Sequence, residues 1–378
     1  MDANRKKSFG KLKKIAIGGI ILCFLFSFIL LKLSSDLSAN EGVALAYSSG
    51  AVVIEQTTRR VLYEEGKDIK LYPASTTKIL TALVVLNNID SSETVKIPKE
   101  AVGIEGSSIY LREGEELTVK ELLLGLMLRS GNDAATALAL KVSGSIEEFA
   151  KLMNETAKEC GAVNSNFVNP HGLHDDNHYT TAYDLALISA KAMENEEFKE
   201  IAATKNAVLP GVEEKRYIQN KNKILWCYEG GNGIKTGFTK KSGRCLVASA
   251  LRDGMQVISV VLNHPSMWED SERYMDYAFS NYEMKPLVEY AYDYATVVKG
   301  KEDKVKIGIK NSPLYPVRED GKDNFRVVTE PFNMKAPVKE GQLAGRVYVY
   351  QGNRLLFEGN LYTLNAVDKK SIFDFFKR

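Results

Sequence analysis

The chain has 378 residues, of which 44% are hydrophobic and 26% are charged, so it can bury a large core and is neither disordered nor a coiled coil. Its net charge of +2 is uneven, because residues 1–35 hold seven basic residues and one acidic residue, a net charge of +6, which leaves −4 for the other 343 residues. A mildly acidic body argues against nucleic acid as a partner, since a nucleic-acid surface needs a concentrated basic face.

An uncharged apolar run of seventeen residues, Ile15 to Leu31, follows the basic stretch. At about 1.5 Å per residue, a helix of this length crosses most of a roughly 30 Å hydrocarbon layer. Its basic flank fits the positive-inside rule, and nothing before it could cover its other faces as a core helix would require. We therefore expect residues 1–36 to be a cleaved signal or a retained anchor. The rest of the chain would then lie on the extracytoplasmic face of the cytoplasmic membrane.

The next part of the chain changes its periodicity twice. Strand-like alternation from 43 to 63, with a polar tip at 57–59, predicts adjacent antiparallel strands. Apolar residues at three- and four-residue steps then predict helices from 73 to 193. Two-residue periodicity returns beyond 233, before a last helix around 271–283. We expect an α+β catalytic domain over 40–284, in which an antiparallel sheet is split by a helical subdomain.

Residues 285–365 carry short strand-like runs broken by glycine, proline and charged pairs, which predicts a separate small all-β domain. The last segment, 366–378, places Ile372, Phe373, Phe375 and Phe376 among charges as a short amphipathic tail. Such a tail could be a membrane-surface helix or a locally packed terminus.

Four cysteines are present, and Cys23 falls in the apolar run. The other three cannot all pair with one another, and no CxxC spacing supports a zinc ribbon or a thioredoxin-like site. We expect Cys160, Cys227 and Cys245 to be buried thiols that pack as small hydrophobic groups.

The first candidate catalytic motif is Ser75-Thr-Thr-Lys78, which opens the first predicted helix. Residues at i and i+3 share a helical face, so Ser75 and Lys78 suit a serine nucleophile and its lysine base. Burial or a nearby cation would depress the pKa of that lysine and let it accept the proton. Read alone, the motif also fits an N-cap serine beside a solvated lysine.

The second motif, Ser130-Gly131-Asn132, lies at the joint between two predicted helices. There the Ser130 side chain can relay a proton and the Asn132 side chain can hold a substrate amide. The same residue types also end one helix and begin the next, so capping is the alternative and is compatible with catalysis.

The third motif, Lys235-Thr236-Gly237, is flanked by strand-like sequence. The glycine lets a substrate approach the strand edge, which can bind a peptide as an added strand. Lys235 would supply the cation that keeps the first lysine neutral, and Thr236 can bind a carboxylate. The backbone N–H of Phe238 would complete an oxyanion hole with that of the nucleophile. An ordinary turn in a sheet is the alternative for this motif alone.

Taken together, the order SxxK, SxN and KTG is the signature of penicillin-recognising serine hydrolases. The chain resembles the low-molecular-mass penicillin-binding proteins that are serine-type D-alanyl-D-alanine carboxypeptidases, over roughly residues 40–365. The resemblance implies a β-lactamase/DD-peptidase-like catalytic domain that needs neither metal nor cofactor. The roles it implies are Ser75 as nucleophile, Lys78 as general base, Ser130 in proton relay, and Asn132, Lys235, Thr236, Gly237 and Phe238 in substrate binding.

By this resemblance the expected activity is removal of the terminal D-alanine from peptidoglycan stem pentapeptides through an acyl-serine, with β-lactam antibiotics as inhibitors. One alternative is a β-lactamase of the same fold, but no ExxLN-like segment supplies a deacylating carboxylate. The other is a catalytically weak peptidoglycan-binding or sensing protein, against which the intact motif residues argue.

Two departures from the family pattern stand out. Phe238 occupies a position that is often histidine in other members. The segment NHPSMWEDSER, which ends in Arg273, does not show the arginine that some members use for the substrate carboxylate. Arg244 and Arg252 are the candidates to replace it.

A zinc peptidase is the competing interpretation. The residues His171, His174, His178, Asp175 and Asp176 offer ligand types within eight positions. A metal site, however, would leave the three serine-hydrolase motifs unexplained. We expect these residues to form a hydrogen-bonded loop beside the cleft, with no metal.

Overall fold

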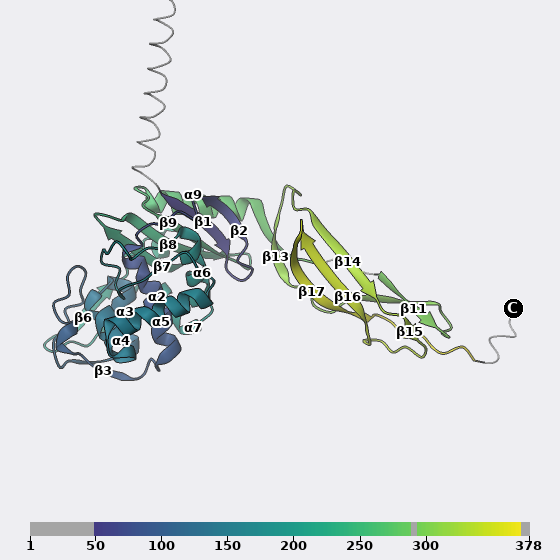
Figure 1. Ribbon diagram of the computed structural model, residues 1–378, viewed down its shortest axis with the longest axis horizontal. Helices are drawn as coiled ribbons and strands as arrows, with labels where there is room; N and C mark the ends of the chain where they lie inside the picture. The colour runs from purple at the N-terminus through teal and green to yellow at the C-terminus, as the bar shows by residue number, and fades with distance from the viewer. Residues whose placement is uncertain (1–48, 289–292, 372–378) are drawn as a thin grey trace, which may run out of the picture. The chain divides into compact units, whose positions relative to one another are not determined.

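The computed structural model describes residues 49–288 and 293–371 (Figure 1). The expected signal or anchor over 1–36, the strand expected at 43–48 and residues 372–378 of the tail lie outside the described residues. Within the described ranges, no helix is long and apolar enough to cross a membrane.

The catalytic part is built on a five-stranded antiparallel sheet with the strand order β2-β1-β9-β8-β7. Its first two strands are the predicted pair, and the turn between them forms because the Glu55 carboxylate accepts the backbone N–H groups of Thr57 and Thr58. β7, which carries the Lys-Thr-Gly motif, is an edge strand as expected. The strands are β1 Gly50–Glu55, β2 Val61–Glu65, β7 Gly231–Thr239, β8 Gly243–Arg252 and β9 Met255–Leu262.

Alternate residues of the central strands enter two different cores. Val52 and Ile54 pack with the inserted helices, whereas Ala51 and Val53 pack with α9 on the other face. The helices are α2 Lys78–Asn88, α3 Val119–Arg129, α4 Asn132–Ser143, α5 Ile146–Glu159, α6 Ala182–Ala192, α7 Glu196–Ala203, α8 Ile224–Cys227 and α9 Met267–Asn281, with 3-10 turns η1 Ala74–Thr77 and η2 Lys99–Ala101. The strand pairs β3 Thr94–Lys96 with β4 Glu116–Thr118, and β5 Asn206–Leu209 with β6 Arg216–Gln219, interrupt the helical block.

The trailing part is all-β, as predicted. Its two-stranded sheet pairs β10 Tyr282–Pro286 with β13 Leu314–Arg318, and its six-stranded sheet encloses a third core around Ile307, Val347 and Leu361. The order of the larger sheet is β14 Phe325–Pro331, β16 Leu343–Gln351, β17 Arg354–Thr363, β12 Lys304–Ile309, β11 Asp293–Val298 and β15 Met334–Lys335. The domain boundaries expected from the sequence stay predictions.

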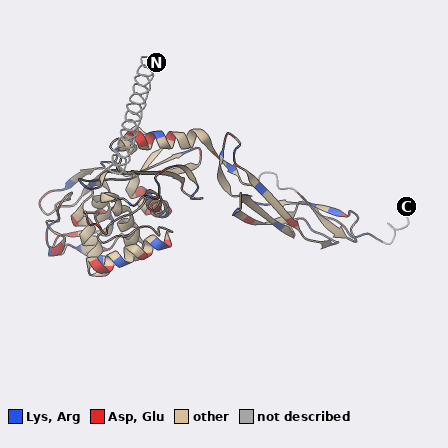
Figure 2. Ribbon diagram, turned by 45° about the horizontal axis from the view of Figure 1, so that its top comes forward, with Lys and Arg blue, Asp and Glu red and all other residues tan. Residues whose placement is uncertain are grey.

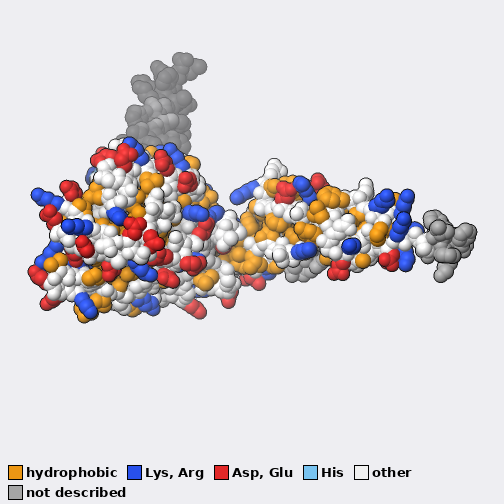
Figure 3. All heavy atoms as spheres, turned by 90° about the horizontal axis from the view of Figure 1, so that it is seen from below, with side chains coloured by type: hydrophobic (Ala, Val, Ile, Leu, Met, Phe, Trp, Pro, Cys, Tyr) orange, Lys and Arg blue, Asp and Glu red, His pale blue; other side chains and the backbone are white. Residues whose placement is uncertain are grey.

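Charges of both signs are interspersed along the described elements (Figure 2) and over the face seen in Figure 3. That distribution agrees with the mildly acidic composition of the body.

The cysteine expectation is correct for Cys245, which is buried, and wrong for Cys227, which is exposed. Cys227 ends the four-residue helix α8, where Ile224 and Leu225 supply the buried side chains instead. Cys160 is partly buried, and all three thiols are free.

Candidate active site

Ser75 lies in a single 3-10 turn, η1, directly before α2, rather than in the first turn of the α-helix itself. The turn begins with Ala74 in the left-handed region at φ 49°. Gly172 packs against it so closely that a β-carbon at Gly172 would lie 1.8 Å from Ala74 O. This contact ties the turn that carries Ser75 to the loop that follows Pro170.

Lys78, one turn after Ser75, is fully buried and makes three polar contacts. Its Nζ lies 3.1 Å from Ser75 Oγ, 2.7 Å from Asn132 Oδ1 and 2.7 Å from the backbone oxygen of His171. Burial, followed by the charge of Lys235, lowers the pKa of Lys78 well below its ordinary value. The predicted pairing of Ser75 with Lys78 is therefore present, in surroundings that favour a neutral amine.

The chemistry of the three contacts assigns a direction to each hydrogen bond. An amide or backbone oxygen can only accept, so Asn132 Oδ1 and His171 O take the two N–H groups of a neutral Lys78 amine. The lone pair is then left facing the hydroxyl of Ser75. This arrangement is what a general base for Ser75 requires.

The Ser-Gly-Asn motif lies where expected, between α3 and α4. Ser130 ends α3 in the left-handed conformation, at φ 64°, and its hydroxyl is buried with no hydrogen-bond partner among the described residues. Asn132 begins α4, and its side-chain amide also donates to Glu105 O. Asn132 thus holds the lysine, a contact that the sequence did not predict.

The Lys-Thr-Gly motif on β7 packs against the serine turn. A β-carbon at Gly237 would lie 3.1 Å from Ser75 N, which brings the strand edge beside the nucleophile. Lys235 is buried, and its Nζ donates to Thr236 O at 3.1 Å. Burial and the charge of Lys221 lower the pKa of Lys235 to about 7. Phe238, whose backbone N–H is the expected oxyanion donor, is 65% exposed.

Three contributors to the site were not predicted from the sequence. The backbone oxygen of His171 binds Lys78, Lys221 acts on the pKa values of both active-site lysines, and Asp133 is buried directly after Asn132. The only sequence signal was for Asp133, an acidic residue next to the Ser-Gly-Asn motif. The other two depend on tertiary contacts that no local pattern encodes.

The histidine loop is hydrogen-bonded, as expected. His178 Nδ1 accepts from Val168 N, so Nε2 carries the proton and donates to Thr77 Oγ1 at 2.8 Å. His171 Nδ1 accepts from Leu173 N. Burial lowers the pKa of His178 to about 4 and that of His171 to about 3, so both rings are neutral near pH 7. In the described ranges, no three histidine, cysteine or acidic side chains are grouped to hold a metal ion.

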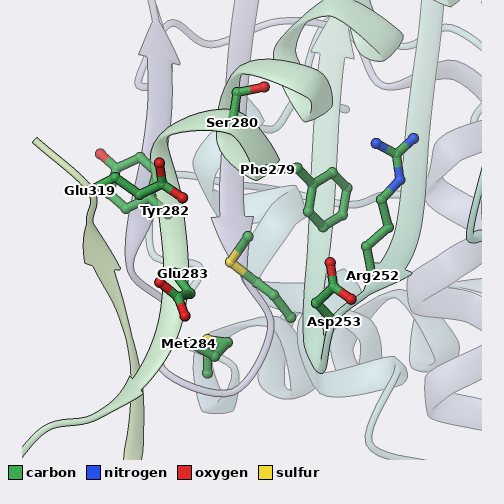
Figure 4. A pocket seen from close by; sticks show the side chains of 9 residues that line it. Arg252, Asp253, Phe279, Ser280, Tyr282, Glu283, Met284 and Glu319 are labelled. Carbon is green, nitrogen blue, oxygen red and sulfur yellow. The ribbon is translucent and has the colours of Figure 1, made fainter.

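The two arginine candidates differ in position. Arg244 is paired with Phe238 across β8 and β7, beside the motif. Arg252 ends β8 and stacks on Tyr228 and Phe279. It lines a cavity of about 490 Å³ with α9 and β10 residues (Figure 4). Gly237 pairs with Cys245 near the start of β8, whereas Arg252 is the last residue of that strand. Arg252 is therefore too far from the motif to bind a carboxylate there.

Comparison with known proteins agrees with this geometry. The profile of the D-alanyl-D-alanine carboxypeptidase family matches residues 39–266, and that of the penicillin-binding protein 5 C-terminal domain matches residues 282–369. The chain is 35% identical over 344 residues to D-alanyl-D-alanine carboxypeptidase DacF of Bacillus subtilis, covering 88% of each chain. It is 30% identical to DacA of Haemophilus influenzae over 357 residues, covering 89% of this chain and 87% of that protein.

Solved structures show the same fold. Penicillin-binding protein 5 of Haemophilus influenzae superimposes with a TM-score of 0.66 at 29% identity, covering 85% of this chain and 97% of that chain. DacD of Francisella tularensis gives a TM-score of 0.66 at 26% identity, covering 85% of this chain and 94% of that chain. The expected α+β catalytic fold with an all-β C-terminal domain is confirmed.

Proposed function

This chain belongs to the D-alanyl-D-alanine carboxypeptidase family, and from that premise we propose that it removes the terminal D-alanine from peptidoglycan stem pentapeptides through an acyl-enzyme on Ser75. The observation that carries this proposal is the contact of Lys78 Nζ with Ser75 Oγ at 3.1 Å. Asn132 Oδ1 and His171 O accept the two N–H groups of the neutral Lys78 amine. The lone pair of the amine is therefore directed at the Ser75 hydroxyl, which must lose a proton.

In the acylation step, Ser75 Oγ attacks the carbonyl carbon of the penultimate D-alanine while its proton passes to Lys78 Nζ. The developing oxyanion is held by the backbone N–H groups of Ser75 and Phe238, which the close approach of Gly237 to the serine turn brings together. The C–N bond then breaks, and the proton held by Lys78 passes through the Ser130 hydroxyl to the leaving amine. The Ser130 hydroxyl has no hydrogen-bond partner among the described residues, so it is free to relay this proton.

In the deacylation step, water attacks the ester carbonyl and gives its proton to Lys78, which passes that proton to Ser75 Oγ as the ester C–O bond breaks. The lysine can act in both steps because its pKa is held well below its ordinary value, so that it accepts and returns a proton more readily than a solvated lysine. The reaction needs only water and groups of this chain, and we propose no metal and no cofactor.

The carboxylate of the terminal D-alanine is the natural partner of the Lys-Thr-Gly strand. Lys235 is a buried cation whose described hydrogen bond is to Thr236 O, so it can attract an anion at the strand edge. Binding a carboxylate there would raise the pKa of Lys235 from about 7 and keep it charged in the complex.

The relatives do not favour the β-lactamase alternative, because those reported above are carboxypeptidases and the match extends through the C-terminal domain. An activity assay distinguishes the proposed enzyme from an inactive binding module. The test is release of D-alanine from a stem pentapeptide by the wild-type chain and by Ser75→Ala. Release by the wild type alone supports the proposal. No release by a folded wild-type chain contradicts it.

We also propose that the chain acts on the extracytoplasmic face of the cell membrane, attached through residues 1–36. The support is the uncharged run from 15 to 31 and its basic flank in the sequence. Removing residues 1–35 should give a folded protein that stays in the soluble fraction. If that protein still partitions to membranes, another segment is the anchor, and 366–378 is the first candidate.

A further inference from the structure

A tyrosine beside the active site is held in a costly backbone conformation with its ring in solvent. Tyr110 has φ 60°, in the left-handed region that bulky residues avoid, and is 81% exposed. Its ring packs into neither the catalytic core nor the core of the trailing domain. Packing of the ring therefore does not explain why the chain keeps this conformation.

Four hydrogen bonds fix the backbone around Tyr110. The buried Asp133 carboxylate accepts the N–H groups of Ile109 and Leu111, one on each side of it. Ser108 Oγ accepts Tyr110 N, and Arg216 donates to Tyr110 O. The clamp orders the loop before any ligand arrives, which lowers the entropic cost of a contact made by the ring.

The clamp is continuous with the catalytic site. Asp133 follows Asn132 in α4, and Asn132 N donates to Ser107 O at 2.7 Å. Gly106 lies so close to Asn132 that a β-carbon there would be 2.8 Å from its side-chain nitrogen. The loop that presents Tyr110 therefore rests on Asn132, the residue proposed to hold the substrate amide.

A shallow hollow of about 250 Å³ adjoins the ring. Its apolar lining includes Ile109 and Val212, and the ion pair of Arg112 with Glu213, at 2.7 Å, lies at its rim. An exposed aromatic ring beside aliphatic groups and paired charges suits a neutral ligand that offers a flat apolar face together with hydroxyl groups. A sugar ring has both properties.

Chain lengths limit how far the ring can lie from Asn132. Two residues separate Ser107 from Tyr110, so their Cα atoms are at most about 11 Å apart, and the side chain adds roughly 6 Å. A five-residue stem in extended form spans about 17 Å. These lengths are upper limits, and they place the ring within the span of an extended stem whose far end is joined to the glycan.

We infer that Tyr110 and the adjoining hollow bind the sugar at the base of the stem peptide, as a substrate-anchoring surface outside the catalytic cleft. This inference rests on the proposed function, because it assigns the occupant from the same substrate. The surface would add affinity for peptidoglycan fragments that carry sugar and none for short peptides.

The test compares three substrates on the full-length chain: a diacylated L-Lys-D-Ala-D-Ala tripeptide, the free stem pentapeptide and the disaccharide pentapeptide. Tyr110→Asn removes the ring with a residue that tolerates the left-handed region. We expect it to raise KM for the disaccharide pentapeptide about threefold to tenfold, as loss of one aromatic contact implies. The kcat for that substrate and the kinetics of the two peptides should not change, and Tyr110→Phe should behave as the wild type.

Tyr217→Asn is the matched control. Tyr217 is also 81% exposed, but it is paired with Val208 on β5 and does not line the hollow. Equal losses on all three substrates would show that Tyr110 acts only through the loop and would overturn the inference. An equal loss on the free pentapeptide would assign the ring to the peptide rather than the sugar, and no loss anywhere would also overturn it. If the wild type releases D-alanine from none of the three, it is the proposed function that fails.

Discussion

Gly237 approaches Ser75 so closely that a β-carbon on the glycine would lie 3.1 Å from Ser75 N and 3.0 Å from Pro73 O. A methyl group at this position has to push the strand edge away from the serine turn. Because the oxyanion donors lie on these two elements, we expect Gly237→Ala to slow acylation by penicillin by roughly tenfold or more. Stopped-flow acylation measures this rate. An unchanged rate in a folded variant would show that the two elements do not form the oxyanion hole.

The charge of Lys235 adds to burial in lowering the pKa of Lys78, and so affects the pH at which Lys78 becomes a base. Burial and that charge both hold the pKa of Lys78 below its ordinary value, so Lys235→Gln should raise it. Activity requires neutral Lys78 and is lost as the pH falls through its pKa. The acidic limb of kcat/KM should therefore move to higher pH, with a weaker affinity for the substrate carboxylate as well. Lys223→Gln, at an exposed lysine over the Trp268 ring, serves as the control. An acidic limb that stays in place would count against the coupling.

The buried His178 ring predicts loss of stability in acid. Burial lowers its pKa from 6.5 to about 4, so the unfolded chain binds the proton more tightly than the folded chain. The free energy of unfolding should therefore decline as the pH falls from 6.5 toward 4, because the unfolded chain takes up the proton while His178 in the folded chain stays neutral. His178→Gln should flatten this part of the curve of Tm against pH. If the variant keeps the same acid dependence as the wild type, other groups cause it.

We expect Asp133, which lies outside the three motifs, to contribute strongly to the stability of the folded chain. It is buried and accepts the backbone N–H groups of Ile109 and Leu111. Asp133→Ala leaves both donors unsatisfied, which should lower the free energy of unfolding by about 2 kcal/mol or more. Urea unfolding measures the change, and Asp133→Asn, which keeps one acceptor oxygen, should lose less. A loss within 0.5 kcal/mol, the usual range for a surface substitution, would contradict the clamp.

The sequence predicted those parts of the structure that depend on local pattern. The periodicities located the first strand pair, the helical block and the all-β part, and motif order identified Ser75, Lys78, Ser130 and Lys235 as one candidate site. The spacing of Ser75 and Lys78 needs only helical geometry to bring them together.

The contacts that the sequence did not predict join residues that are distant in sequence and meet only in the folded chain. His171 O reaches Lys78 from 93 positions away, and Asp133 clamps a loop 22 to 24 positions before it. The expectation for Cys227 was wrong because burial on a four-residue helix depends on which side faces the core. Arg252 was a reasonable candidate by residue type, yet its end of β8 is remote from Gly237.

The central claim is that Ser75 is the acylated nucleophile of a carboxypeptidase whose sequence has no ExxLN-like segment to supply a carboxylate for clearing a tethered β-lactam fragment. The most direct measurement is mass spectrometry of the full-length chain after incubation with penicillin, followed by peptide mapping. We expect a long-lived mass increase equal to one intact penicillin molecule on the peptide that contains Ser75, and none in Ser75→Ala. Rapid penicillin turnover without an adduct, or an adduct on another residue, would contradict this account.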